Sequence, residues 1–293
     1  MKKFSLNFHG TIKEYTRPLV MGILNVTPDS FFGGSRTLSG ANSVDSEKAN
    51  VGAVEAMAAK LIAEGADMID VGGCSTRPGS DVVSLEEELS RVKLGVETAR
   101  RLAPDIPISV DTFRAEVAQR AVEEWGADII NDIASGLMDK DMIPTVAKLG
   151  VPYIMMHMRG TPDAMSTMTD YPNGVVCGVA SELKERINEA LMAGIGDIII
   201  DPGFGFAKTI EQNYQLMVGL NELAMLLDNR PMLVGISRKS MIYKPLGITP
   251  NEALPATTAL NAVALECGAA ILRVHDVAAC RQAVDVIELL QNN

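Results

Sequence analysis

Eight short apolar runs recur along this chain, and each ends in polar residues that are capable of chemistry. The runs are of strand length and rich in branched residues. They cover residues 19–26, 68–71, 106–110, 129–130, 153–156, 198–200, 232–236 and 270–274. Uninterrupted apolar strands are typical of a parallel sheet covered on both faces, where polar side chains gather at the strand ends. This layout predicts a parallel sheet with its active site along one edge.

The stretches between these runs have helical spacing, which is clearest over residues 114–125, where apolar residues recur every third or fourth position. Ser84 and Glu87 have the spacing of a capping box that opens another helix. Four stretches end in similar phrases with glycine at positions 65, 126, 194 and 268, and glycine tolerates the left-handed conformation that ends a helix. Eight strands alternating with helices predict an α/β fold, the (β/α)8 TIM barrel, which typically needs about 250 residues.

The chain has 293 residues, which leaves room for an addition before the first barrel strand. Phe4, Leu6 and Phe8 alternate with polar residues, and a second short run follows. This pattern predicts a β-hairpin under the floor of the barrel. We therefore expect a hairpin extension over residues 1–18 and a single barrel domain over 19–293. A doubly wound open sheet is the alternative, but no glycine-rich phosphate turn follows the first strand.

Composition limits the class of protein. No apolar run approaches the roughly 18 residues of a membrane span, and polar residues interrupt any signal-peptide core near the N-terminus. The four cysteines lie far apart without a Cys-x-x-Cys pair, so a reducing cytoplasm is a simpler expectation than disulfides or a zinc site. A net charge of -11 and a pI near 4.8 argue against a general nucleic-acid surface.

Cationic side chains stand out against this acidic background. They recur near the strand ends at Arg77, Arg159, Lys208, Arg238, Lys239 and Arg273, with His275 beside the last. If the barrel brings several of them together, they form a local anion site that suits phosphate or pyrophosphate. Local salt bridges are the main alternative for Arg159 and Lys208, and a weaker one for the run of residues 237–239.

A second group of polar residues has a different chemistry. Asp111, Asn131 and Asp201 each follow an apolar strand, so we expect them deep in the open end of the barrel. A buried carboxylate needs hydrogen-bond donors, and the edge of an aminopyrimidinone ring, with its amino and ring N–H groups, supplies them. Capping of the following helix is the alternative for any one of these residues. Three together, with Lys239 opposite, favour a ligand.

Seven strand-end motifs then match a known family in order. They are Leu-Asn-Val-Thr-Pro-Asp-Ser-Phe at 24–31, Asp-Val-Gly-Gly at 70–73 with Ser-Thr-Arg-Pro-Gly at 75–79, Ser-Val-Asp-Thr at 109–112, Ile-Asn-Asp at 130–132, Asp-Pro-Gly-Phe-Gly-Phe at 201–206, Gly-Ile-Ser-Arg-Lys-Ser at 235–240 and Arg-Val-His-Asp at 273–276. Together they resemble the motifs of dihydropteroate synthases. The resemblance runs from the first strand to the last, and seven motifs in sequence are far more specific than any one alone.

The resemblance implies a pterin-binding barrel that joins 6-hydroxymethyl-7,8-dihydropterin diphosphate to 4-aminobenzoate, releasing pyrophosphate and forming 7,8-dihydropteroate in folate biosynthesis. It implies a pterin site of Asp111, Asn131, Asp201 and Lys239. It implies a diphosphate site of Asn25, Arg77, Arg273 and His275, with Mg²⁺ bridging Asn25 and phosphate oxygens. It implies a 4-aminobenzoate pocket of Phe31, Thr76, Pro78, Phe206 and Ser237, with Arg238 alongside. The family is often homodimeric, and we expect the same here.

These residues suit a dissociative, SN1-like substitution, since no nucleophile or dedicated base is required. Mg²⁺, Arg273 and His275 would stabilise the leaving group, and Asp111 and Asp201 would favour the pterin cation. Lys239 completes the expected catalytic set. Two alternatives stay open: a corrinoid methyltransferase that uses methyltetrahydrofolate, and a catalytically silent pterin-binding relative. His157, Asp70 and Asp29 are given no ligand role.

Overall fold

The computed structural model of the chain describes residues 3–27, 43–74, 83–161 and 164–291. Its centre is an eight-stranded parallel sheet. The strands are β3 (Leu19–Asn25), β4 (Met68–Gly72), β5 (Ile108–Asp111), β6 (Ile129–Asp132), β7 (Tyr153–Met156), β8 (Ile198–Asp201), β9 (Leu233–Val234) and β10 (Ile271–Val274).

The sheet closes on itself. Strands β3 to β8 pair in chain order, β10 lies between β3 and β9, and β9 returns beside β8. The return is made by a parallel bridge between Ile200 and Met232 and by a hydrogen bond from the Ile200 amide to the Pro231 carbonyl at 3.0 Å. The predicted barrel is therefore confirmed, and the open-sheet alternative is wrong.

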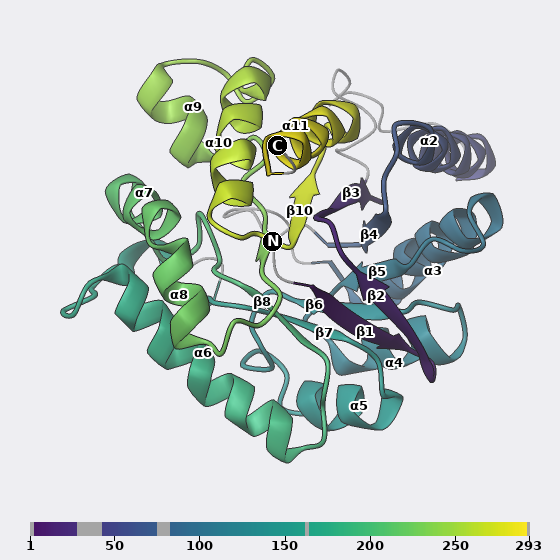
Figure 1. Cartoon of the computed structure of the whole chain (residues 1–293). Helices are drawn as coiled ribbons and strands as arrows, with labels where there is room; N and C mark the ends of the chain where they lie inside the picture. The colour runs from purple at the N-terminus through teal and green to yellow at the C-terminus, as the bar shows by residue number, and fades with distance from the viewer. Residues whose placement is uncertain (1–2, 28–42, 75–82, 162–163, 292–293) are drawn as a thin grey trace.

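Helices surround this barrel (Figure 1). The described ones are α2 (Ser43–Ala63), α3 (Leu85–Leu102), α4 (Ala115–Glu123), α5 (Met142–Leu149), α6 (Val175–Met192), α7 (Ile210–Val218), α8 (Leu220–Leu226), α9 (Ser240–Leu246), α10 (Leu254–Glu266) and α11 (Val277–Gln291), with a 3-10 turn at Met165–Thr167. The helix predicted over 114–125 is α4, whose apolar residues Val117, Ala118 and Ala121 are fully buried.

The turns from helix to strand follow the predicted glycine rule. Gly65, Gly126, Gly194 and Gly268 all have positive φ, between 81° and 101°. The capping box predicted at Ser84 is half formed. The Ser84 hydroxyl accepts the Glu87 amide at 3.2 Å, but the Glu87 carboxylate pairs with Arg91 one turn further along the helix. A complete capping box stands instead at the start of α7.

The N-terminal segment forms the predicted hairpin of β1 (Phe4–Phe8) and β2 (Thr11–Tyr15). Leu6 and Phe8 pack in one buried cluster with residues from the beginning of the barrel strands, among them Leu19, Met68 and Ile199. In Figure 1 the purple hairpin lies across this end of the barrel, in front of β5, β6 and β7. The hairpin therefore covers the floor, and the opposite end of the barrel is left for chemistry. The division of the chain into two parts at residue 18 stays a prediction.

Two further observations concern the whole described part of the chain. None of the helices in residues 3–27, 43–74, 83–161 and 164–291 is long and apolar enough to cross a membrane. The four cysteines all lie within these ranges, and none of them forms a disulfide.

Candidate active site at the carboxyl ends of the strands

An arginine and two carboxylates join three strands at the open end of the barrel. Arg273 of β10 donates from Nε to Asp70 Oδ2 of β4 at 2.6 Å, and from Nη2 to Asp111 Oδ2 of β5 at 2.7 Å. Asn131 of β6 donates from Nδ2 to the same Asp70 oxygen at 3.1 Å. We call these four residues the strand-end cluster. Two charge-assisted bonds from one guanidinium fix its orientation.

Burial controls the charge of these groups. Burial raises the pKa of Asp111 to about 7, while the Arg273 guanidinium opposes the rise. Burial also raises the pKa of Asp201, although Lys239 opposes this. Conversely, burial lowers the pKa of Lys239 to about 8, with the Asp201 carboxylate opposing. Asp111 and Lys239 therefore change protonation close to neutral pH.

Asp201 and Lys239 come from the other side of the barrel. The Asp201 carboxylate accepts the Gly203 amide at 2.8 Å, directly after β8. Lys239 is the N-cap residue directly before helix α9, and its ammonium donates to the Phe204 carbonyl and lies 4.8 Å from the centre of the Phe206 ring. The turn after β8 therefore connects the carboxylate, the ammonium and the aromatic ring.

Ser237 and His275 form a contact of their own. His275 Nδ1 lies 3.0 Å from Ser237 Oγ, and the His275 amide donates to the same hydroxyl at 3.3 Å. The resemblance assigns these residues to different substrates, and the contact places the two assigned regions side by side. Arg238, between Ser237 and Lys239, makes a bidentate pair with Asp276, with Nε–Oδ2 at 3.0 Å and Nη2–Oδ1 at 2.6 Å.

Asn25 lies at the end of β3, where a glycine keeps space open. A methyl group built on Gly72 would stand 3.3 Å from Asn25 Oδ1 and 4.0 Å from Asp111 Oδ2. Within the described ranges, no group of three or more His, Cys, Asp or Glu side chains is arranged to hold a metal. Mg²⁺ does not require such a cage, because it keeps several waters and binds through few protein oxygens together with substrate phosphates. The Asn25 oxygen fits that mode.

Several of the predicted site residues are not part of this geometry. Phe31, Thr76, Arg77 and Pro78, together with Asp29, lie outside the described residues. Arg159 and Lys208 are described, and the local-contact alternative holds for both. Arg159 pairs with Glu182, and Lys208 contacts His157 and backbone carbonyls.

The sequence did not reveal that Asp70 lies at the centre of the strand-end cluster. Its side chain is fully buried and accepts from both Arg273 and Asn131, and its second oxygen, Oδ1, has no hydrogen-bond partner in the described part of the chain. One signal was available in the sequence, because Asp70 is a charged residue inside the apolar run of residues 68–71.

Two surface hollows lie away from these residues. One, of about 600 Å³, is lined by charged and polar side chains of α4, of the segment before α5 and of α5 itself. The other, of about 220 Å³, is lined by Arg159, Tyr171 and one side of α6. Neither hollow is lined by a residue of the strand-end cluster. The converging charged groups, and not the size of a hollow, therefore indicate where the candidate active site lies.

Comparisons with known proteins show the family of this chain. Residues 21–275 match the family model described as pterin binding enzyme. The chain is 42% identical over 291 residues to the dihydropteroate synthase of Escherichia coli, covering 98% of this chain and 96% of that protein. It resembles the solved structure of Xanthomonas albilineans dihydropteroate synthase with 4-aminobenzoic acid, with a TM-score of 0.84 and 40% identity, covering 99% of this chain and 98% of that chain.

Longer relatives contain a similar region. The folic acid synthesis protein fol1 of Pneumocystis carinii is 41% identical over 282 residues, which are 94% of this chain and 36% of that protein. The chain thus spans only about a third of the length of the fungal fol1 relatives that it matches. The match along nearly the whole chain, the eight-stranded barrel and the strand-end residues lead to one conclusion: the chain belongs to the dihydropteroate synthase family of pterin-binding enzymes.

Proposed function

We propose that this chain transfers the dihydropterin-methyl group of 6-hydroxymethyl-7,8-dihydropterin diphosphate to the amine of 4-aminobenzoate. Pyrophosphate leaves, and 7,8-dihydropteroate forms. One observation carries the proposal: Asp111, an acid that suits ring N–H donors, is 2.7 Å from Arg273, a guanidinium that suits an anion. A substrate with a pterin at one end and a diphosphate at the other matches this neighbouring pair. Relatives from Xanthomonas albilineans have been solved with 4-aminobenzoic acid and with 7,8-dihydropteroate.

At the pterin end, we assign Asp111, Asn131, Asp201 and Lys239. Asn131 and Asp201 are buried, so polar groups here gain most from a ligand that offers complementary donors and acceptors. A carboxylate accepts from amino and ring N–H groups, whereas the Lys239 ammonium donates to ring oxygen or nitrogen. The acids also favour the electron-poor form of the pterin.

At the diphosphate end, we assign Asn25, Arg273 and His275, together with Arg77, which lies outside the described residues. Arg273 is already paired with Asp70 and Asp111. When pterin N–H groups donate to Asp111, they compete with Arg273 for that carboxylate and make the guanidinium available to a phosphate. The two ends of one substrate are thereby recognised together.

Mg²⁺ is proposed to accompany the diphosphate, with the Asn25 amide oxygen as its protein ligand. When bound, the ion neutralises negative charge on the departing pyrophosphate. The contribution of the chain is to present this oxygen at the space that Gly72 leaves open. Carboxylate cages are not needed for an ion that arrives with its substrate phosphates.

For 4-aminobenzoate, we assign Phe206, Ser237 and Arg238, together with Phe31, Thr76 and Pro78 outside the described residues. Phe206 lies beside the Lys239 ammonium, which would put an aromatic wall next to the pterin. Arg238 is held by both oxygens of Asp276, so its proposed part is to border the pocket.

The proposed reaction is a dissociative substitution. The bond between the methylene carbon and the diphosphate oxygen breaks first, and its electrons leave with pyrophosphate. The resulting methylene cation is conjugated to the pterin and is attacked by the aromatic amine, whose extra proton passes to solvent. Arg273 and His275 stabilise charge on the leaving group, and holding the amine in line supplies much of the remaining acceleration. A clear secondary isotope effect on deuteration of the methylene is expected, and its absence would favour concerted displacement.

We also propose a cytoplasmic homodimer. A homodimer is supported by apolar side chains exposed on neighbouring helices, such as Val218 at the end of α7 and Met225 in α8, which are 80% and 66% exposed. The lack of disulfides among the four cysteines suits a reducing compartment. Sedimentation of the purified protein tests the dimer.

The activity is tested by incubating the purified protein with the pterin diphosphate, 4-aminobenzoate and Mg²⁺, and detecting 7,8-dihydropteroate by mass. Lys239→Ala should weaken binding of any pterin, whereas Arg273→Ala should mainly impair binding of the diphosphate substrate. Wild-type turnover in both variants would mean that the site is misplaced. Pterin binding without product in the unaltered protein would instead support a silent relative, and methyl transfer from methyltetrahydrofolate would support the corrinoid alternative.

A further inference from the structure

A buried lysine outside the proposed substrate contacts has all its donors occupied. The Lys208 ammonium donates to the carbonyls of Gly203 at 2.9 Å and Phe206 at 3.0 Å, and lies 3.0 Å from His157 Nδ1. Burial lowers the pKa of Lys208 to about 7, and in its ammonium form the side chain has three N–H donors and no acceptor, so these three partners satisfy it completely. Lys208 is therefore fixed in position, although it has no direct role in the proposed reaction.

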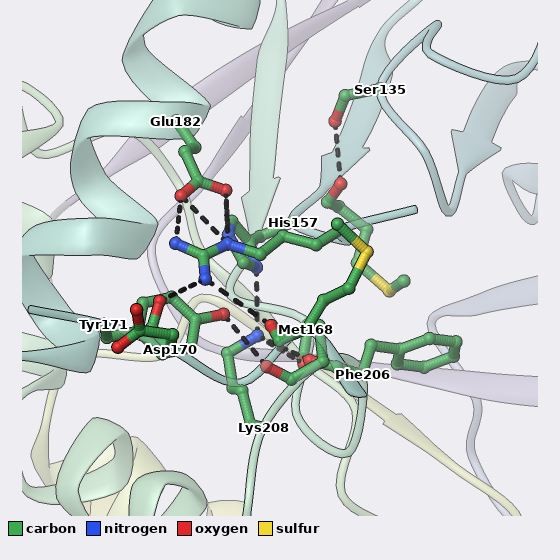
Figure 2. A network of polar contacts seen from close by, with 12 residues as sticks. Ser135, His157, Met168, Asp170, Tyr171, Glu182, Phe206 and Lys208 are labelled. Carbon is green, nitrogen blue, oxygen red and sulfur yellow. Dashed lines mark hydrogen bonds and ion pairs between the residues drawn. The ribbon is translucent and has the colours of Figure 1, made fainter. Parts of the chain in front are cut away.

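His157 and Glu182 orient Lys208, because His157 contacts Lys208 and Glu182 contacts His157. His157 Nε2 lies 3.1 Å from Glu182 Oε2, so the imidazole stands between the carboxylate and the ammonium (Figure 2). Burial, followed by the nearby Lys208 charge, lowers the pKa of His157 to about 4. The ring is thus neutral near pH 7, with Nδ1 accepting from Lys208 and Nε2–H donating to Glu182.

The Glu182 carboxylate is itself held in place. Arg159 Nε donates to both of its oxygens at 3.0 Å, and the Arg159 guanidinium lies 3.8 Å from the centre of the Tyr171 ring. Tyr171 in turn donates its hydroxyl hydrogen to the Ala207 carbonyl at 3.1 Å. These contacts connect strand β7, helix α6 and the segment after β8, and they leave the Lys208 ammonium little freedom.

Lys208 holds the turn at residues 203–206, and Lys239 contacts the same turn. The Phe206 amide donates to the Gly203 carbonyl at 3.1 Å, so Lys208 binds both ends of one turn. The carbonyl in the middle of that turn, on Phe204, accepts from the Lys239 ammonium, and the Phe206 ring lies 4.8 Å from the same group. Displacement of the turn would therefore move two neighbours of the lysine assigned to the pterin.

We propose that Lys208 is a positioning residue: through the carbonyls of Gly203 and Phe206 it sets the turn that orients Lys239 toward the pterin. The proposal rests on the assignment of Lys239 in the proposed function. Lys208 itself touches no substrate, and His157 and Glu182 act by orienting Lys208.

A double-mutant cycle tests this coupling. The affinity for 6-hydroxymethyl-7,8-dihydropterin diphosphate is measured by equilibrium binding, without 4-aminobenzoate, in the unaltered protein and in Lys208→Met, Lys239→Met and the double variant. Displacement of the turn should weaken the charged contact between Lys239 and the pterin, which predicts about tenfold weaker binding in Lys208→Met. In the Lys239→Met background, the same change should cost less than about twofold, because residues that act through one another are not additive.

The matched control is Lys148→Met, the same substitution at an exposed lysine of α5, and it should leave the affinity unchanged. An undiminished affinity in Lys208→Met would overturn the proposal. So would an equal tenfold loss with and without Lys239, since that result indicates general damage to the fold. Circular dichroism and thermal melting show which variants remain folded.

If Lys208→Met does not fold, substitutions of His157 decide the question. An Asn side chain at position 157 can place its amide oxygen where His157 Nδ1 stands, so it keeps the contact with Lys208. A Gln side chain can place its amide nitrogen where Nε2 stands, so it keeps only the contact with Glu182. His157→Asn should therefore retain more pterin affinity than His157→Gln, and the reverse order would overturn the proposal. None of these binding measurements needs turnover. Failure of the unaltered protein to make product would count against the proposed function alone, and an additive cycle with normal product would count against Lys208 alone.

Discussion

Arg273 and Asp111 form an ion pair at 2.7 Å although 162 residues separate them in the chain. The guanidinium proposed for the diphosphate is thus already bound to a carboxylate proposed for the pterin. Asp70 accepts from Nε of the same guanidinium at 2.6 Å. In the proposed function, the pterin of the substrate replaces Arg273 as the partner of Asp111, and the diphosphate replaces Asp111 as the partner of Arg273. A pterin without a diphosphate makes only the first of these two replacements.

Replacing Arg273 should therefore separate the two ligands. In Arg273→Gln, binding of the pterin diphosphate should weaken by about 30-fold, the range for a lost charged hydrogen bond. Binding of 7,8-dihydropteroate, which has no diphosphate, should change by less than about threefold when it is measured above the acidic limb of the pH profile described below. Calorimetric titration of both ligands measures the difference. Arg101→Gln is the control, because that arginine is exposed and pairs with Glu55 on the outer helices. Equal losses for both ligands would contradict the assignment.

The affinity for 7,8-dihydropteroate should depend on pH with a maximum near neutrality. Burial raises the pKa of Asp111 to about 7, so below that pH the carboxyl is protonated and loses part of its capacity to accept from the pterin. Burial lowers the pKa of Lys239 to about 8, so above that pH the ammonium charge is lost. Binding measured from about pH 5 to about pH 10, roughly two pH units beyond each pKa, should rise and then fall.

Two variants test whether Asp111 produces the acidic limb of that pH profile. Asp111→Asn cannot ionise, so the rise toward pH 7 should disappear. Arg273 opposes the raised pKa of Asp111, so Arg273→Gln should move the acidic limb to higher pH. An acidic limb that is unchanged in Asp111→Asn would show that another group controls it.

The hairpin under the barrel should contribute to stability through its inner face only. Leu6 is 1% exposed and packs against the strand beginnings, whereas Ile12 on the partner strand is 68% exposed. Truncating a buried leucine costs about 3 kcal/mol, so Leu6→Ala should lower the free energy of unfolding by that amount. Ile12→Ala should change it by less than about 0.5 kcal/mol. Urea denaturation of both variants provides the comparison, and similar small effects would mean that the hairpin does not seal the floor.

Gly203 should be intolerant of any side chain. Its φ is +70°, and a methyl group added there would stand 1.9 Å from the His157 carbonyl oxygen. Gly203→Ala must therefore displace the turn after β8 and should cost at least about 2 kcal/mol of stability from the strained backbone and clash. Gly196→Ala is the matched control, because nothing lies within 4 Å of the added methyl. Thermal melting and pterin binding should both separate the two variants.

Features that depend on local sequence were predictable. Apolar runs and glycine stops reveal strands and turns, because burial and positive φ act within a few residues, and Asp111, Asn131 and Asp201 were found because each ends such a run. The strand predicted over 232–236 is shorter, covering Leu233–Val234. The chain leaves the sheet there and turns at Arg238, whose φ of 56° is incompatible with a strand.

Features that depend on closure of the barrel were not predictable. Asp70 meets Arg273 across 203 residues only because β10 returns beside β3, next to β4. Lys208 and Arg159 carry the same charge as Lys239 and Arg273 in the sequence, yet packing against helix α6 directs them to His157 and Glu182. Spacing along the chain shows which residues lie at strand ends, and tertiary packing decides which of them remain available to a ligand.

The most direct test of the proposed function is pyrophosphate release by the purified protein, followed together with 7,8-dihydropteroate. The mixture contains the pterin diphosphate, Mg²⁺ and 4-aminobenzoate, and each component is omitted in turn. We predict that both products appear in equal amounts and only when all three components are present. Release of pyrophosphate without dihydropteroate, or binding of the pterin diphosphate with no release at all, would contradict the proposed transfer to 4-aminobenzoate.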